Sequence, residues 1–302
     1  MAEAEETLES MPLALLVNPS SGGGRTKEML PPLENELDQR RLEFRVERTR
    51  SREHAIELAL AAAEAGELPV VMSGDGLIGA VGGALTGTEV PMGIVPGGRG
   101  NDLARVLGIP SDPAGAADVL AAGSTRLIDV GEANGERFLS IASTGFDSEC
   151  NDLANRTTLV RGNLVYAYSA LRTLVSWEPA RFTVKIGEES LRYTGYSVAA
   201  ANSKAFGGGM MLAPDADLAD GQFDVVMISD VSKWHYLRNL PKVFKGTHID
   251  NEEIRIVRAP RIEISASRPF ALYADGEPIT ELPATLRVLP RALRVVAPPA
   301  PA

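Results

Sequence analysis

The chain has 302 residues, of which 44% are hydrophobic, so it is long enough for about two domains with separate cores. It carries 40 acidic and 30 basic residues, a net charge of −10, which argues against a general nucleic-acid-binding protein because such domains are basic. The single cysteine, Cys150, excludes an internal disulfide and a cysteine-built zinc site, and the three histidines match no zinc-site spacing.

The first part of the chain alternates strand-like and helical segments. The strand-like runs are Leu13–Val17, Glu43–Glu47, Val70–Met72, Met92–Val95 and Leu127–Val130, with helical stretches such as Arg52–Ala65 and Asp112–Ala122 between them. This alternation predicts an α/β fold, a doubly wound domain with a mostly parallel sheet over residues 11–130. Ligands of such sheets bind at the carboxyl ends of the strands.

The pattern changes after residue 130. Short alternating segments predict an antiparallel, β-sandwich-like domain over residues 131–287, and we expect residues 288–297 to pack back on the first domain. The predicted strands are Phe138–Ala142, Phe182–Ile186, Tyr193–Ala201, Phe223–Ile228, Ile254–Val257, Ile262–Ser265 and Phe270–Tyr273, interrupted by helices at Leu164–Val175 and Lys233–Phe244.

No apolar run approaches the roughly 20 residues of a membrane-spanning helix, and the acidic start MAEAEETLES is the opposite of a signal peptide. We therefore expect a cytoplasmic protein whose contact with a membrane, if it makes one, is peripheral at the inner face.

Glycine-rich loops follow three of the predicted parallel strands: Asn18–Gly24, Ser73–Gly76 and Pro96–Asp102. Each loop alone is ordinary turn chemistry. Because the strands end at one edge of the sheet, the three loops together would line one crevice with backbone N–H donors, Asp75, Asp102 and Arg99. This favours a polyphosphate site with room for hydrated magnesium over simple turns. Neither a GxxxxGK[ST] loop nor a GxGxxG motif after the first strand is present.

These motifs resemble the diacylglycerol kinase catalytic family, in the bacterial branch related to sphingosine kinases. NPSSG (18–22), SGDGL (73–77) and PGGRGNDLAR (96–105) match the loops of the first domain. STGFD (143–147), PDADLADGQFD (214–224) and YADGEPI (273–279) match later landmarks in order. The resemblance thus covers nearly the whole chain and implies ATP bound in a cleft between the two domains, with Mg²⁺ as the metal.

The resemblance also implies roles for individual residues. Asp275 and Glu277 would supply the base that accepts the proton of the lipid hydroxyl, while Asp75 and Asp102 would organise magnesium. Asp220 would ligate a second, structural magnesium by its side chain, and Asp217 and Gln222 by their backbone carbonyls. The nucleotide would contact Asn18, Pro19, Ser20, Ser21, Gly22, Thr49, Gly74, Asp75, Gly76, Leu77, Gly98 and Arg99. Without the resemblance, the Asp-Gly-Glu segment and the acidic loop at 217–222 would be interpreted as turns.

The sequence departs from the family pattern at three positions. Leu77 and Arg99 stand where threonines are usual, and Ala80 replaces a Glu thought to help hold the nucleotide. We therefore expect the affinity for the nucleotide, or the choice of nucleotide, to differ from the common family pattern. The acidic residues that the family pattern requires are present.

The leading hypothesis is an ATP- and Mg²⁺-dependent kinase that phosphorylates a lipid hydroxyl, most simply converting diacylglycerol to phosphatidic acid in phospholipid biosynthesis. The alternatives are a kinase for sphingosine or monoacylglycerol, an NAD kinase, and a nucleotide-binding protein that has lost catalysis. The expected partner is the lipid substrate at a membrane surface, with no nucleic acid; whether the protein is a homodimer stays open. The basic, aromatic stretch Val231–Thr247 would either lie on an anionic membrane or pack its apolar stripe on its own domain.

Overall fold

The computed structural model describes residues 11–157 and 164–300, so the acidic start lies outside the described residues, as does the end of the PPAPA tail. The chain forms two compact units. Of the described residues, one unit comprises 11–128 and 291–300, and the other is Asp129–Pro290. The sequence-based division fell at residues 130 and 288.

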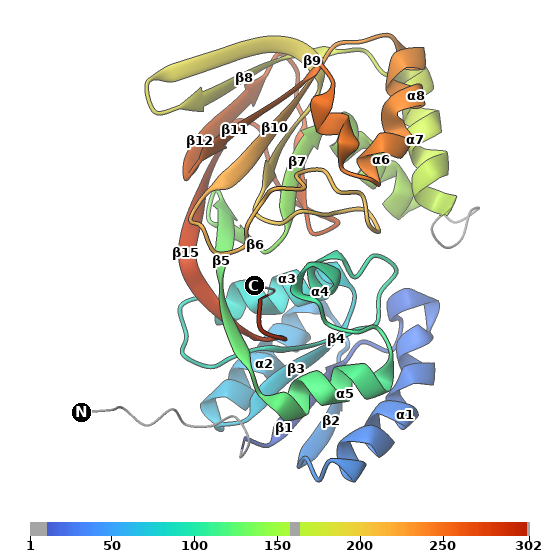
Figure 1. Cartoon of the computed structure of the whole chain (residues 1–302), viewed down its shortest axis with the longest axis vertical. Helices are drawn as coiled ribbons and strands as arrows, with labels where there is room; N and C mark the ends of the chain where they lie inside the picture. Colours follow the sequence, from blue (N-terminus) through green and yellow to red (C-terminus); the bar gives the residue numbers. More distant parts are fainter. Residues whose placement is uncertain (1–10, 158–163, 301–302) are drawn as a thin grey trace. The chain divides into compact units, whose positions relative to one another are not determined.

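The first unit is a four-stranded sheet in the order β2-β1-β3-β4 (Figure 1). Its strands are β1 (Leu13–Val17), β2 (Phe44–Arg48), β3 (Leu68–Ser73) and β4 (Gly93–Pro96), all parallel. Its helices are α1 (Arg25–Gln39), α2 (Arg52–Glu64), α3 (Asp75–Leu85), α4 (Asp102–Leu107) and α5 (Pro113–Ala122), with a 3-10 turn η2 (Ser21–Gly23). The predicted α/β architecture is therefore observed.

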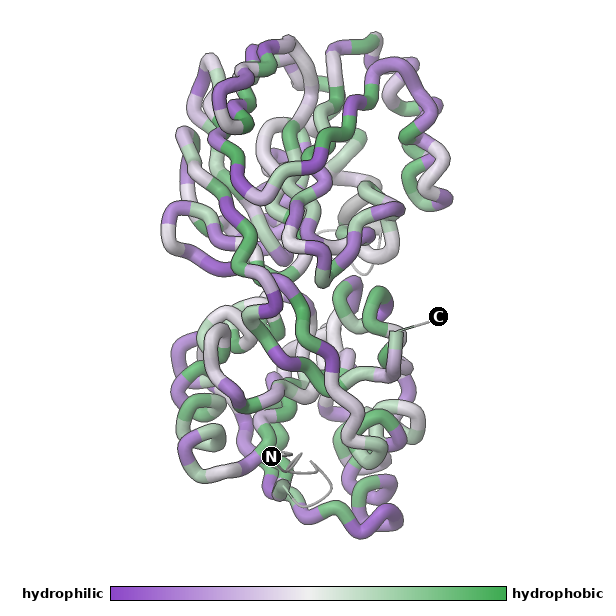
Figure 2. The backbone as a smooth tube through the Cα atoms, turned by 60° about the vertical axis from the view of Figure 1, so that its left-hand side comes forward, coloured by the Kyte–Doolittle hydropathy of each residue, from purple (hydrophilic) through white to green (hydrophobic). Residues whose placement is uncertain are grey.

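The burial pattern explains why these segments form this sheet. Every residue of β1 and β3 is buried, because helices cover the sheet and leave neither face to solvent. Hydrophobic and hydrophilic residues follow one another at short intervals along much of the backbone (Figure 2). On α1 the apolar positions Met29, Leu30, Leu33 and Leu37 are buried against the strands.

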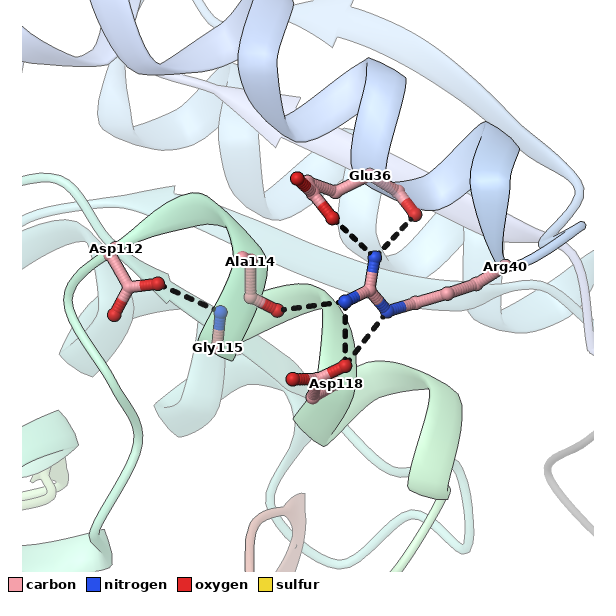
Figure 3. A network of polar contacts seen from close by, with 6 residues as sticks. All are labelled: Glu36, Arg40, Asp112, Ala114, Gly115 and Asp118. Carbon is pink, nitrogen blue, oxygen red and sulfur yellow. Dashed lines mark hydrogen bonds and ion pairs between the residues drawn. The ribbon is translucent and has the colours of Figure 1, made fainter.

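Polar contacts join two of these helices (Figure 3). The guanidinium of Arg40, just after α1, donates to the Glu36 carboxylate at 2.6 Å and to Asp118 of α5 at 2.6 Å. It also reaches the Ala114 carbonyl, while Asp112 caps the start of α5 through the N–H of Gly115. Arg40 therefore fixes the C-terminal end of α1 beside α5.

One predicted strand of this sheet was assigned to the wrong sheet. Residues Leu127–Val130 fall within β5 (Thr125–Ala133), which pairs antiparallel with β6 (Glu136–Phe138) in the second unit's sheet. The chain end lies beside β4 instead, where Met92 forms a parallel bridge with Val295 and exchanges backbone hydrogen bonds with Arg294 and Val296. The alternation of apolar and polar residues along a strand does not specify which sheet the strand joins, because both sheets bury the same kinds of side chain.

The second unit is built on an eleven-stranded sheet in which neighbouring strands run antiparallel. Beyond β5 and β6 its strands are β7 (Ile141–Gly145), β8 (Ala180–Ile186), β9 (Glu189–Ala201), β10 (Phe223–Ser229), β11 (Ile254–Ala259), β12 (Arg261–Ala266), β13 (Ala271–Ala274), β14 (Glu277–Glu281) and β15 (Ala284–Val296). Helices α6 (Phe146–Arg156), α7 (Leu164–Ser176) and α8 (Lys233–Val243) and a 3-10 turn η3 (Thr247–Asp250) accompany it. The sequence analysis did not predict α6, β14 or the long strand β15.

An aromatic cluster forms part of the core of this unit. Phe146 packs edge-to-face on Trp177, Tyr196 and Tyr236, with ring centroids 5.4, 5.7 and 5.1 Å away. This cluster anchors α6 and α8 on β9. No helix in the described part of the chain is long and apolar enough to cross a bilayer.

Candidate functional site

The three glycine loops of the first unit lie against one another. A β-carbon added to Gly22 would lie 2.5 Å from the carbonyl oxygen of Gly97, and one added to Gly74 would lie 3.2 Å from the Cα of Gly98 and 3.5 Å from the hydroxyl of Ser21. A β-carbon at Gly98 would in turn overlap Gly74. The backbones approach too closely for a side chain at Gly22 or Gly98 and leave only a tight fit at Gly74, which favours glycine at these positions. The expected convergence of the loops is thus a feature of the fold.

Asn18 shapes the first loop from inside. Its side-chain oxygen accepts hydrogen bonds from the N–H and the hydroxyl of Ser20, at 3.1 and 2.9 Å. Its carbonyl accepts from the hydroxyl of Thr26 at 2.6 Å, and its N–H donates to Met72 of β3. Gly22, inside the η2 turn, has a φ of +60°, a conformation that glycine adopts without strain. The loop therefore has a fixed shape next to the end of β3.

Two carboxylates lie where the second and third loops meet. Asp75 is the first residue of α3, and its Oδ1 accepts the N–H of Leu103 at 3.3 Å. Asp102, the first residue of α4, is buried and pairs with Arg105 at 2.7 Å. Asn101, with a φ of +53°, closes this loop by accepting the N–H of Gly98 at 2.7 Å. The Asp75–Leu103 hydrogen bond therefore connects the start of α3 to the start of α4, beside Asp102.

This pair of carboxylates supplies the kind of oxygen donors that a magnesium ion takes beside phosphate oxygens and water, with the ion competing with Arg105 for the carboxylate of Asp102. In the described part of the chain no group of three His, Cys, Asp or Glu side chains could hold a metal by itself. A Mg²⁺ ion bound by one or two carboxylates usually takes its remaining ligands from water and phosphate oxygens.

The other predicted nucleotide contacts lie on the same loops or close to them. Pro19 and Ser20 belong to the first loop, and Gly76 and Leu77 to the first turn of α3. Thr49 follows β2 and donates its N–H to Val17 at the end of β1, at 2.9 Å. The side chain of Arg99 is exposed on the third loop, whereas Ala80 is buried on α3.

The Asp-Gly-Glu segment of the second unit is a tight turn between β13 and β14, as a turn interpretation of these residues predicts. Asp275 has a φ of +52°, and its carboxylate accepts the N–H groups of Leu139 and Ser140 at 2.8 and 2.9 Å. The carbonyl of Gly276 accepts from the side chain of Asn155 at 3.1 Å. Both carboxylate oxygens of Asp275 thus hold the β6–β7 connection.

Glu277 differs from Asp275 although the two are separated by one residue. It is the first residue of β14, where Ala274 is its partner across the turn, and it is exposed. A carboxylate at a defined backbone position and open to solvent can approach a substrate hydroxyl, which a carboxylate engaged by two backbone N–H groups does less readily.

In the loop predicted to hold a second metal, Asp220 already has a cation partner. One Asp220 oxygen accepts the N–H of Gln222 at 2.9 Å, and the other forms an ion pair with Arg258, which also lies 3.6 Å from Asp224. The Asp217 carboxylate accepts the N–H of Ala219 at 3.0 Å. Magnesium at Asp220 would have to displace Arg258, so these residues fit the metal poorly as they stand, and the second site stays a prediction.

Sequence reasoning missed Asp129, the residue that anchors this loop. Asp129 is fully buried, accepts the N–H of Gly221 at 2.6 Å and donates its own N–H to the carbonyl of Leu218 at 2.6 Å. The side chain of Asn202 donates to its carbonyl at 2.9 Å. The sequence signal that could have identified Asp129 is its position as the single carboxylate in the apolar run LIDV (127–130), because a charged group within a buried strand needs polar partners.

A second carboxylate, Asp147 at the start of α6, was noted only as part of the STGFD motif. Its Oδ2 atom is shielded from solvent and has no hydrogen-bond partner. Burial raises the pKa of Asp147 from 3.8 to about 6, partly offset by a hydrogen bond with Ser197. Burial and the neighbouring Asp147 charge together raise the pKa of the Tyr193 and Tyr236 hydroxyls.

The geometry defines a class: an α/β unit whose clustered glycine loops and carboxylates suit a polyphosphate, joined to an antiparallel β-domain. Comparison with known families agrees. Residues 12–133 match the diacylglycerol kinase catalytic domain, and residues 140–297 match the YegS C-terminal NAD kinase beta sandwich-like domain. The chain belongs to the family of bacterial diacylglycerol and lipid kinases.

Individual relatives support this assignment. The chain is 35% identical over 248 residues to a diacylglycerol kinase of Mycobacterium tuberculosis (strain CDC 1551 / Oshkosh), covering 80% of each chain. It is 31% identical over 293 residues to a diacylglycerol kinase of Bacillus subtilis (strain 168), covering 94% of this chain and 95% of the relative. A crystal structure of a diacylglycerol kinase from Bacillus anthracis str. Sterne shares the fold, with a TM-score of 0.73 at 20% identity over 96% of this chain and 97% of that one.

Proposed function

We propose that the protein is an ATP- and Mg²⁺-dependent lipid kinase that transfers the γ-phosphate to a lipid hydroxyl, with diacylglycerol as acceptor and phosphatidic acid as product. The observation that carries the proposal is the packing of the three glycine loops against one another, next to Asp75 and Asp102. Such a cluster presents backbone N–H groups to an anion and carboxylates to the cation that accompanies it. The names of the M. tuberculosis and B. subtilis relatives support diacylglycerol as the acceptor.

In this proposal the first unit binds the nucleotide. The loops at Asn18–Gly22, Gly74–Leu77 and Gly98–Arg99 hold the phosphates, with Thr49 nearby, and Asp75 and Asp102 hold the metal. Bound magnesium would neutralise charge on the phosphates during transfer. The exposed guanidinium of Arg99 adds a positive charge to the third loop, where a threonine is usual.

Glu277 acts as the general base in this proposal. Its carboxylate takes the proton of the lipid hydroxyl while the hydroxyl oxygen forms a bond to the γ-phosphorus and the bond between that phosphorus and the bridging oxygen of ADP breaks. A positioned base of this kind contributes about 10²- to 10⁴-fold in rate. Asp275 is a positioning residue, because its two oxygens accept the N–H groups of Leu139 and Ser140 and thereby fix the turn that carries Glu277.

A transfer assay tests the proposal. Purified protein is incubated with γ-labelled ATP, Mg²⁺ and dispersed diacylglycerol, monoacylglycerol, sphingosine or ceramide, and with NAD as a separate acceptor. We expect label in diacylglycerol, dependence on Mg²⁺, and loss of transfer in Asp75→Ala. The matched control is Asp118→Ala, which removes an exposed carboxylate that pairs with Arg40 and belongs to none of the three loops.

The other outcomes separate the alternatives. Label in NAD without lipid would identify an NAD kinase, and label in another lipid would change the acceptor. Tight ATP binding without transfer to any acceptor would contradict a kinase function and favour a nucleotide-binding protein, in which case Ala80→Glu is the first change to test.

A further inference from the structure

The loop before β10, residues 214–222, uses its carboxylates to hold its own backbone. The carboxylate of Asp217 accepts the N–H of Ala219 at 3.0 Å. One oxygen of Asp220 accepts the N–H of Gln222 at 2.9 Å. Aspartate side chains that accept from the backbone two residues further on fix a turn without any bound ligand. The loop therefore has a defined shape in which one oxygen of Asp220 is already engaged.

A guanidinium engages the other oxygen of Asp220. Arg258 belongs to β11, which lies beside β10 (Figure 1), and the register of this antiparallel pair places it directly opposite Asp224. Its Nη2 atom forms the ion pair with Asp220, and its Nε atom lies 3.6 Å from Oδ1 of Asp224. Residues directly opposite each other in such a pair extend to the same face of the sheet. The strand register therefore directs Arg258 toward both carboxylates.

These carboxylates need a positive charge that their own segment does not contain. The segment from Asp215 to Asp224 has four acidic residues and no basic residue. Asp224 is 5% exposed, and burial together with the charge of Asp215 raises its pKa. The compensating charge must come from another part of the fold or from a bound cation. The side chain of Arg258 and a metal ion cannot both occupy the position between Asp220 and Asp224.

We propose that Arg258 takes the place of the second magnesium ion in this chain. Its guanidinium, between Asp220 and Asp224, supplies the positive charge that holds the loop at the start of β10, and the loop binds no divalent metal ion while Arg258 is in place. A guanidinium suits this role because it is planar, presents several N–H donors and is always charged. This role of Arg258 is independent of the proposed function, because it belongs to the folded protein without nucleotide.

Removing the guanidinium is expected to turn the loop into a metal site. Mg²⁺ and Mn²⁺ bind through one or two carboxylates and complete their coordination with water. Asp220 and Asp224 both approach the guanidinium of Arg258, so an ion that replaced it would meet the same two carboxylates. Arg258→Met removes the charge and keeps an unbranched side chain, which makes it the variant to test.

Electron paramagnetic resonance of Mn²⁺ counts the bound ions in the absence of nucleotide. We expect Arg258→Met to bind one Mn²⁺ ion more than the wild type, with a dissociation constant of about 1 mM or below. The additional ion is expected to disappear in the double variant Arg258→Met with Asp220→Asn. That loss would assign it to the loop rather than to Asp75 and Asp102 of the first unit. Asp220→Asn alone is expected to bind as much Mn²⁺ as the wild type.

Thermal unfolding measures the contribution of Arg258 to stability. In the presence of EDTA we expect Arg258→Met to melt at least about 3 °C below the wild type. Mg²⁺ is expected to raise the melting temperature of Arg258→Met more than that of the wild type, because the ion restores the missing charge. Arg255→Met is the matched control, since Arg255 is an exposed arginine of the same strand that lies 3.9 Å from Glu189. It is expected to melt like the wild type and to bind no additional ion.

Two further variants separate charge from shape. Arg258→Gln keeps N–H donors without the charge, and it replaces Arg258→Met, with the same expected ion, where the methionine variant does not fold. Arg258→Lys keeps the charge and is expected to bind no additional ion.

Three results would overturn the proposal. The first is Mn²⁺ binding by the wild type that Asp220→Asn abolishes, because the loop would then hold a metal ion beside Arg258. The second is an Arg258→Met or Arg258→Gln protein that folds and binds no more Mn²⁺ than the wild type. The third is an additional ion in Arg258→Lys, because a positive side chain at this position would then not exclude the metal.

Discussion

Replacing Asp147 by asparagine is expected to stabilise the protein at neutral and alkaline pH. The Oδ2 atom of Asp147 is shielded from solvent without a hydrogen-bond partner, so its ionised form is disfavoured in the folded state. Asparagine has nearly the same shape, is neutral, and can keep a hydrogen bond with Ser197.

The magnitude follows from the pKa. Burial raises the pKa of Asp147 from 3.8 to about 6, and the free energy of ionisation rises by about 1.36 kcal/mol for each pKa unit, so ionised Asp147 costs about 3 kcal/mol of folding free energy. Between pH 3.8 and about 6 the folded state binds more protons than the unfolded state. The stability contribution of this group is therefore complete below pH 3.8 and is lost as the pH rises through 6.

Urea unfolding between pH 4 and pH 8 measures how the unfolding free energies of wild type and Asp147→Asn differ at each pH. Trp177 is a suitable probe of the second unit, since its ring centroid is 5.4 Å from that of Phe146, the neighbour of Asp147 in the chain. We expect equal stabilities near pH 4 and a variant more stable by up to about 3 kcal/mol at pH 7 and above. Glu149→Gln, which removes a solvent-accessible carboxylate paired with Arg268, serves as the control and is expected to show no such gain. A variant no more stable than the wild type at pH 8 would refute the reasoning.

Three further expectations concern the loops and the turn. Gly98→Ala should weaken ATP binding at least about tenfold in calorimetry, because its β-carbon would overlap Gly74 and force the loops apart. Gly66→Ala, at a φ of +74° with nothing within 4 Å of the added β-carbon, should lower stability and leave ATP affinity unchanged. Asp275→Asn should lower the free energy of unfolding by about 2 kcal/mol in a urea titration, because an amide can satisfy only one of the two N–H groups that the carboxylate now accepts. Asp102→Asn should reduce the Mg²⁺ dependence of ATP affinity, and an unchanged dependence would place the metal elsewhere.

Much of the fold was predictable because its signals are local. The buried strands of the first unit have unbroken apolar runs such as LALLV, and glycine follows where three of them end. The convergence of the glycine loops followed from a general property of parallel sheets rather than from any single loop.

The rest depended on long-range pairing that periodicity does not encode. The apolar run at Leu127–Val130 looked like one more parallel strand, yet it belongs to β5, whose last residues pair with β6 in the other sheet. The partners of Asp275 are N–H groups more than 130 residues away in sequence, so the difference between Asp275 and Glu277 could not be predicted. For the same reason, sequence alone did not show that Arg258 pairs with Asp220.

The rate of γ-phosphate transfer to diacylglycerol by Glu277→Gln, compared with wild type and Asp275→Asn, tests the central claim most directly. We expect a kcat about 10²- to 10⁴-fold lower for Glu277→Gln, with ATP affinity and unfolding free energy unchanged, because Glu277 is exposed and its replacement removes only the base. For Asp275→Asn we expect a loss of stability with a smaller loss of rate. A Glu277→Gln enzyme that transfers phosphate at nearly the wild-type rate would show that Glu277 is not the base.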